Sequence, residues 1–184
     1  MPSKKEYFAP LGQSQSNKYW IPWIQKQLIL NGVLAQTPEM PEPYKPNYEK
    51  WCSVFKQLKI DKDTMLVGHS CGGGFLVRWL SENKVKVGMV ALVAPWMDPD
   101  NSFHLKNNFF RFKIDWDLVK RTGGLTIFVS KDDYRDVIKS VNFLKDNLRG
   151  PRLRFREFTN KGHFVSGDMK TEKFPELRDA LLKS

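Results

Sequence analysis

The sequence of 184 residues has only two cysteines, three histidines and no apolar run near the ~20 residues that a membrane-spanning helix needs. Cys52 and Cys71 belong to no metal-ligand cluster, so we expect neither a disulfide scaffold nor a metal site. The first residues, MPSKKE, lack the apolar core of a secretion signal. These absences predict a protein of the reducing cytoplasm with no membrane span, no metal and no other cofactor.

The composition is that of a packed globule, because 41% of the residues are hydrophobic and 13% are aromatic. The length predicts one domain spanning residues 1–184. The formal net charge is +10. Its densest cluster places Arg152, Arg154 and Arg156 on one face of an expected strand. This pattern is typical of a solvated edge strand, and an acidic partner is the alternative. No nucleic-acid-binding motif accompanies it, so nucleic acid is not expected, and no protein partner is indicated.

Apolar strand patterns alternate with helical patterns along the chain. We predict strands at 5–9, 33–37, 64–68, 85–94, 125–130 and 153–158, and helices at 18–31, 47–58, 72–83, 136–148 and 171–182. This alternation favours an α/β three-layer sandwich with a mostly parallel sheet.

Residues 101–121 interrupt this alternation with an excess of aromatic side chains. One interpretation is an amphipathic helix and a loop packed on the sheet. The other is a short cap whose side chains give an apolar wall to a substrate pocket. The candidates for that wall are Phe109, Phe110 and Trp116, together with His69 from another part of the chain. The sequence leaves both interpretations open.

Residues 68–72 read Gly-His-Ser-Cys-Gly between a strand pattern and a helix pattern. In this context G-x-S-x-G predicts a nucleophile elbow, in which Ser70 takes strained backbone angles and presents its hydroxyl at the carboxyl end of a strand. We expect the positions two before and two after the serine to need small residues, and the amide of Cys71 to face a developing oxyanion. An ordinary glycine-rich turn is the alternative.

A serine nucleophile needs a base, and the base needs an acid to orient it. His163 follows a predicted strand directly and lies after Ser70 in the chain, as the order Ser, Asp, His requires. His69 is expected to point away from the serine, and little recommends His104. For the acid, Asp132 and Asp133 both follow the strand at 125–130, and either could instead cap the next helix. We prefer Asp133 for the catalytic role, with Asp132 second.

Several short motifs together resemble the small serine hydrolases of the retinoblastoma-binding-protein-9 and YdeN type, within the α/β-hydrolase superfamily. They are Trp20-Ile-Pro-Trp23, Met40-Pro-Glu-Pro43, Asn47-Tyr-Glu-Lys-Trp51, Val67-Gly-His-Ser-Cys-Gly-Gly73, Ala94-Pro95, Asp115-Trp-Asp117, Ser130-Lys-Asp-Asp133 and Gly162-His163-Phe164. The resemblance implies a compact α/β-hydrolase fold with Ser70 as nucleophile, Asp133 as acid and His163 as base. It also implies cleavage of small esters.

The chain departs from that family where the first strand ends. The family usually has His-Gly there, whereas this chain has Ala9-Pro10-Leu11-Gly12. Because proline has no N–H, a second oxyanion donor would have to come from Leu11, Gly12 or Gln13. The acid loop is also one residue longer than usual and lacks a proline. The family's L-x-C-x-E motif for the retinoblastoma pocket is absent, so that partner is not expected.

The sequence thus predicts a cofactor-independent serine hydrolase acting on a small-molecule ester, thioester or amide. The alternative is a catalytically weak protein of the same fold that serves as a binding module.

Overall fold

The computed structural model describes residues 15–101 and 108–183. Its centre is a parallel sheet of strands in the order β1-β2-β3-β4, which comprise Leu66–His69, Val87–Val93, Thr122–Ser130 and Leu153–Phe158. Because every pairing is parallel, the carboxyl ends of these strands meet at one edge of the sheet. His69 pairs with Val93, and Ser130 with Phe158, so the residues that follow each strand gather at that edge.

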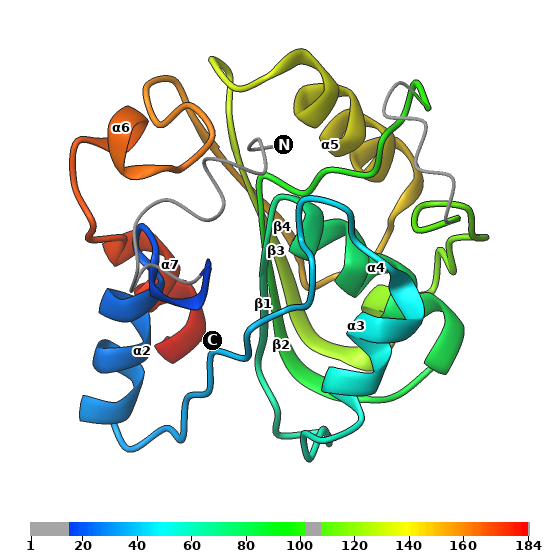
Figure 1. Ribbon diagram of the computed structural model, residues 1–184, viewed down its shortest axis with the longest axis horizontal. Helices are drawn as coiled ribbons and strands as arrows, with labels where there is room; N and C mark the ends of the chain where they lie inside the picture. Colours follow the sequence, from blue (N-terminus) through cyan, green and yellow to red (C-terminus); the bar gives the residue numbers. More distant parts are fainter. Residues whose placement is uncertain (1–14, 102–107, 184) are drawn as a thin grey trace.

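Helices cover both faces of the sheet (Figure 1). On one face lie α2, Ile21–Leu30, and α7, Pro175–Leu182, which contact each other. On the other face lie α3, α4 and α5, which span Tyr48–Phe55, Cys71–Asn83 and Arg135–Asn147. The short helices η1, η2 and α6 are Gln15–Asn17, Leu118–Arg121 and Ser166–Met169. The predicted three-layer α/β architecture with a parallel sheet is therefore confirmed.

Local sequence explains several of the element ends. The side chain of Asn47 accepts a hydrogen bond from the Lys50 amide and so caps the start of α3. Asn31 and Gly32 close α2 as expected, since Gly32 has a φ of +76° that suits a residue without a side chain. The two inner strands β2 and β3 are almost wholly buried, in agreement with their continuous apolar runs.

The predicted secondary structure differs from what is observed in several places, and the last helix begins at Pro175 rather than at residue 171. Residues 33–37 are not a strand, although their burial alternates, because alternation does not provide a pairing partner. The Ala35 carbonyl instead accepts a hydrogen bond from the Gln25 side chain at 3.2 Å. The helix α3 ends at Phe55 rather than at residue 58, and α6 was not predicted. The strand expected at 5–9 lies outside the described residues.

The described part of the aromatic segment, residues 108–121, contains turns and the short helix η2 but no α-helix. The long amphipathic helix considered as one alternative is therefore absent from these residues. Arg78 of α4 holds the start of this stretch, because its Nη1 donates to the carbonyls of Asn108 at 2.7 Å and Phe109 at 2.9 Å. The guanidinium also lies over the Tyr48 ring, with Cζ 3.5 Å from the ring centroid.

Candidate active site

Ser70 lies at the turn between β1 and α4 with φ +53° and ψ −121°, a strained backbone conformation for a residue with a side chain. Hydrogen bonds on both sides hold it there. Its amide donates to the Val93 carbonyl at 2.9 Å, and its carbonyl accepts from the amides of Gly73 at 2.9 Å and Trp96 at 3.1 Å. The turn between β1 and α4 is thus fixed against the loop that follows β2, as a nucleophile elbow requires.

The motif predicts that the positions two before and two after Ser70 need small residues. The structure confirms the first of these positions but not the second. A Cβ on Gly68 would lie 2.6 Å from the Gly72 oxygen, so the position two before the serine must be glycine. A Cβ on Gly72 would meet nothing within 4 Å, and the expectation for this position is wrong. The tight positions are the next two, because a Cβ on Gly73 would lie 2.9 Å from Pro95 and one on Gly74 would lie 2.2 Å from the Trp96 oxygen.

Ser70, His163 and Asp133 form one hydrogen-bonded chain. His163 Nδ1 lies 2.9 Å from Asp133 Oδ1, and His163 Nε2 lies 3.0 Å from Ser70 Oγ. A carboxylate can only accept, so Nδ1 of His163 carries the proton. In the neutral ring Nε2 is then an acceptor, and the Ser70 hydroxyl donates to it. The Asp133 side chain is fully buried, while the His163 side chain is 15% exposed and can reach a substrate.

Asp132, the second choice for the acid, has different partners. Its Oδ1 accepts hydrogen bonds from the Ser130 hydroxyl and from the Gly162 amide. Of the two aspartates, only Asp133 is hydrogen-bonded to His163 among the described residues. Neither aspartate caps α5, because the N-cap is Tyr134 and no side chain caps it. The alternative interpretation of the pair as a helix cap is therefore wrong.

Side chains from several elements hold the loop that carries His163. The Asp168 carboxylate accepts from the His163 amide at 2.7 Å. His69 Nε2 donates to the His163 carbonyl at 2.8 Å, and the buried Trp20 indole donates to the Phe164 carbonyl at 3.1 Å. Gly162 has a φ of +46° and approaches Asp168 so closely that a Cβ would lie 2.5 Å from its carboxyl carbon. The backbone around His163 is thus fixed before any substrate binds.

The His69 side chain, a candidate for the pocket wall, packs among aromatic rings and contacts the loop that carries His163. Its ring packs edge-on against Tyr19 and Trp20 and lies 5.0 Å from the His163 ring, measured between centroids. Desolvation, and to a smaller degree His163, lowers the pKa of His69 to about 3. His69 therefore stays neutral near pH 7, beside the ring of His163.

Cys71 begins α4, where an amide has no carbonyl partner within its own helix. This amide therefore has no partner within α4, and it adjoins Ser70. Desolvation raises the pKa of the Cys71 thiol, which remains protonated near pH 7. Leu11 and Gly12, the expected second donors, lie outside the described residues.

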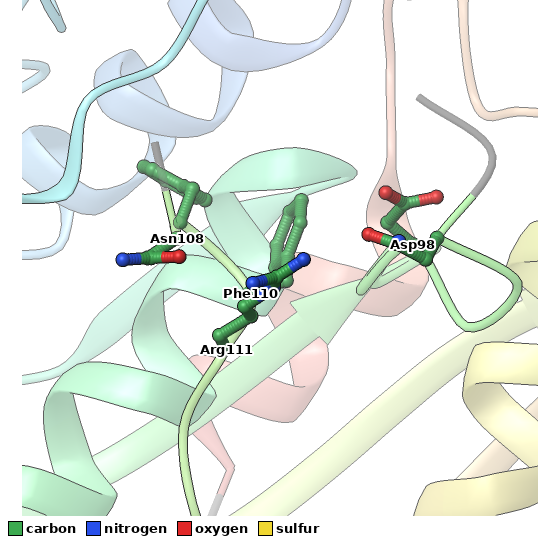
Figure 2. A pocket seen from close by; sticks show the side chains of 6 residues that line it. Asp98, Asn108, Phe110 and Arg111 are labelled. Atoms are coloured by element: carbon green, nitrogen blue, oxygen red, sulfur yellow. The ribbon is translucent and has the colours of Figure 1, made fainter. Parts of the chain in front are cut away.

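A hollow of about 200 Å³ is lined by residues of 98–101 and 108–111, and one of them, Phe110, lies against Gly74 at the start of α4. Figure 2 shows Asp98, from the loop after β2, across from Asn108 and Arg111, with the Phe110 ring between them. The Phe110 ring packs on Trp96 with centroids 5.0 Å apart, and the Trp96 amide donates to the Ser70 carbonyl. Phe110 therefore lies near the elbow. Phe109 also lines the hollow, although its fully buried ring packs among Tyr48, Trp51 and Phe75 in the core.

Trp116, the remaining pocket candidate, lies elsewhere. Its ring is 38% exposed and packs on Phe143 of α5. The preceding residue, Asp115, forms an ion pair with Arg121, and its amide donates a hydrogen bond to the Ser81 hydroxyl at 3.1 Å. Ser81 lies about three turns, roughly 16 Å, along α4 from Ser70. The described structure thus brings Phe110 toward Ser70 but leaves Trp116 at the opposite end of α4.

Sequence reasoning missed four residues that shape the site. Trp20 and Asp168 hold the histidine loop, and Tyr134 places its 69% exposed ring 5.2 Å from the His163 ring. Arg78 anchors the aromatic segment. Of these four residues, only Trp20 could have been found from the sequence, because it belongs to the motif Trp20-Ile-Pro-Trp23. Across 15–101 and 108–183 no group of three metal-ligating side chains gathers, and no helix has the length and apolarity to cross a membrane.

Parallel strands between two helical layers, with a strained serine at the carboxyl end of a strand, define the α/β-hydrolase class of folds. The crystal structure of the ydeN gene product of Bacillus subtilis superposes with a TM-score of 0.74 at 23% identity, covering 94% of this chain and 92% of that one. The esterase domain of a Rhodothermus marinus protein gives a TM-score of 0.62 at 19% identity, covering 88% and 81%.

Sequence comparison agrees with the fold. The chain is 26% identical to YdeN of Bacillus subtilis (strain 168) over 97% of its own length and 95% of that protein. It is 24% identical to the serine hydrolase RBBP9 of Rattus norvegicus over 79% and 77% of the two chains. The family model described as serine hydrolase matches residues 10–172. The chain therefore belongs to the serine hydrolase family, and it is a hydrolase.

Proposed function

We propose that this hydrolase cleaves a small carboxylic ester, thioester or amide through Ser70, His163 and Asp133 and an acyl-enzyme intermediate. The observation that carries the proposal is the unbroken chain from Ser70 Oγ to His163 Nε2 at 3.0 Å and from His163 Nδ1 to Asp133 Oδ1 at 2.9 Å. A hydroxyl, a base and an orienting carboxylate at these distances are what acyl transfer needs.

In the first half of the reaction, Ser70 Oγ bonds to the substrate carbonyl carbon while its proton passes to His163 Nε2. The Asp133 carboxylate stabilises the resulting imidazolium through Nδ1–H. The carbonyl oxygen, now negative, receives a hydrogen bond from the Cys71 amide and, in this proposal, from an amide of Leu11 or Gly12. The bond to the leaving group then breaks, and His163 returns the proton to that group.

In the second half, water replaces the alcohol, thiol or amine that left. His163 takes a proton from the water as its oxygen bonds to the acyl carbon, and it returns the proton to Ser70 as the acid departs. The hollow beside Phe110 suits the acyl chain, and residues 101–121 act in this proposal as a short cap over it. No cofactor takes part. Both described cysteines are free thiols, which fits a reducing cytoplasm.

A fluorophosphonate probe, which reacts with activated serines, tests the proposal. We expect the wild-type protein to be labelled, Ser70→Ala not to be labelled, and Ser53→Ala to be labelled like the wild type. Ser53 is a matched control because it is an exposed serine on α3, away from the elbow. Labelling that persists in Ser70→Ala would overturn the assignment.

The second candidate is a catalytically weak binding module on the same fold, and one feature favours it. Pro10 stands where the family has a potential oxyanion donor, and loss of one such donor can cost roughly 10²–10³ in rate. Turnover of p-nitrophenyl esters distinguishes the two candidates. Rapid turnover of a short acyl ester by the wild type supports the enzyme, whereas labelling at Ser70 without turnover supports the binding module.

A further inference from the structure

A second hollow, of about 250 Å³, lies between the edge strand β4 and the helix α7, away from Ser70. Its lining residues come from β3, β4 and α7 and are mostly basic or hydroxylic: Thr126, Arg154, Arg156, Asp179, Ala180 and Lys183. Thr126 pairs with Arg154 and lies four residues before the end of β3, roughly 13 Å from the catalytic edge of the sheet. The hollow is therefore separate from the proposed active site.

The two arginines that line this hollow have no partner within the described chain. Within the described residues no hydrogen bond, ion pair or ring contact engages Arg154 or Arg156, and both side chains are exposed. The neighbouring charged residues, Glu157 in β4 and Arg152 just before it, do have partners. Lys145 pairs with Glu157 at 3.0 Å, and Arg152 donates to the Gly123 carbonyl at 3.2 Å. Unpaired guanidinium groups beside a cavity present donors that only a ligand or water can accept from.

The one acidic group in the lining is already neutralised. The Asp179 carboxylate forms ion pairs with Arg178 at 2.7 Å and with Lys183 at 3.1 Å. Its charge is thus balanced without Arg154 or Arg156, and the hollow keeps a net positive charge. Thr126 is only 1% exposed but lines the hollow, and no hydrogen bond of the described residues engages its hydroxyl, which leaves that group free for a ligand.

The spacing of the arginines selects the kind of anion. Residues two apart on one face of a strand have side chains about 7 Å apart, so two guanidinium groups can converge on one small anion from both sides. A phosphate dianion offers enough oxygens for a bidentate hydrogen-bonded pair with each of them, whereas a carboxylate can satisfy only one. The formal net charge of +10 also raises the concentration of anions near the surface.

We propose that Arg154 and Arg156, with the Thr126 hydroxyl, form a binding site for a compact phosphate group, either the free ion or the monoester of a small molecule. The hollow is small and holds only two unpaired cations, which suits a single phosphate better than a polymer. A nucleic acid strand would need a longer row of unpaired cations, and Arg152 is already engaged with a backbone carbonyl.

Calorimetric titration of the full chain with inorganic phosphate and with glycerol phosphate tests the site, at constant ionic strength kept with sodium chloride. We expect saturable 1:1 binding that is weakened at least tenfold in the double variant Arg154→Gln/Arg156→Gln. The matched control Arg152→Gln removes the same charge from the residue just before β4 and should change the affinity less than twofold. Ser70→Ala should bind phosphate like the wild type, so this site and the proposed catalysis can fail separately.

The two ligands distinguish the sources of the phosphate group. Glycerol phosphate binding tenfold tighter than phosphate would identify a monoester, and equal affinities would identify the free ion. Equal losses in Arg152→Gln and the double variant would overturn the proposal, because they would indicate a general charge effect. So would absence of saturable binding, or preferred binding of a polynucleotide with a steep salt dependence. Circular dichroism and urea unfolding of each variant verify that these exposed substitutions leave the fold intact.

Discussion

The elbow at 68–74 and the histidine loop at 160–169 lie at the same edge of the sheet but are held in different ways. The elbow is held by backbone. Three glycines allow close approach, the Ser70 amide donates to Val93 at the end of β2, and the Ser70 carbonyl accepts from Trp96 in the loop that follows. The histidine loop is held by side chains, with Asp132, Asp168, His69 and Trp20 each bonded to its backbone. We therefore expect elbow substitutions to damage the fold and loop substitutions to damage catalysis.

The largest expected effect concerns the acid that orients His163. Asp133→Asn replaces an acceptor with an amide that no longer fixes the proton on Nδ1, and we expect kcat to fall roughly 10⁴-fold with the fold unchanged. The matched control is the adjacent Asp132→Asn, whose oxygen can still accept from the Gly162 amide. It should lose less than tenfold. A larger loss in Asp132→Asn than in Asp133→Asn would reverse the assignment of the two aspartates.

The next effect tests the steric fit of the elbow. In Gly74→Ala the new Cβ would lie 2.2 Å from the Trp96 oxygen, so the backbone must move, and we expect a loss of about 3 kcal/mol in the free energy of unfolding. Gly72→Ala, two residues earlier in the same helix turn, meets nothing within 4 Å. It should gain about 0.5–1 kcal/mol from helix propensity. Urea unfolding measures both, and equal effects would contradict the steric account.

A smaller effect is expected from the anchor of the histidine loop. Trp20→Phe keeps one six-membered ring in the buried site but removes the five-membered ring, with the N–H that donates to the Phe164 carbonyl at 3.1 Å. An unsatisfied buried acceptor costs about 1–3 kcal/mol, so unfolding should become easier by that amount. Because His163 precedes Phe164 directly, kcat should fall several-fold with KM unchanged. An unaltered kcat would show that the loop is held without this bond.

The same contrast explains what the sequence could predict. The elbow depends on residues adjacent in the chain, so Gly68 and Ser70 could be recognised from a local pattern. The choice between Asp132 and Asp133 could not, because it depends on where the Gly162 amide and the His163 ring lie, about thirty residues later. Pairing with a distant strand also decides which strand predictions succeed. The predicted bounds of β4, Leu153–Phe158, are confirmed because β4 pairs with β3. Residues 33–37 show the same alternation of burial but have no pairing strand.

The smallest expected effect is a pH dependence that isolates His69. Its pKa is lowered to about 3 in the folded protein, whereas an unfolded histidine titrates near the ordinary value of about 6.5. Below that value the unfolded chain binds a proton that the folded one does not, so His69 makes stability fall as the pH falls. Between pH 7 and pH 5.5 this contribution amounts to about 1 kcal/mol.

His69→Gln tests this, because the glutamine amide can still donate to the His163 carbonyl but does not titrate. The free energy of unfolding of the wild type should fall by about 1 kcal/mol more than that of the variant between pH 7 and pH 5.5. Carboxylates also make stability depend on pH. Desolvation raises the pKa of Asp115, but hydrogen bonds and the charge of Arg121 outweigh it and lower the pKa. Such groups act alike in the wild type and the variant, so their contributions cancel in the difference. Parallel pH profiles would contradict this account, because they would mean that folding does not lower the pKa of His69.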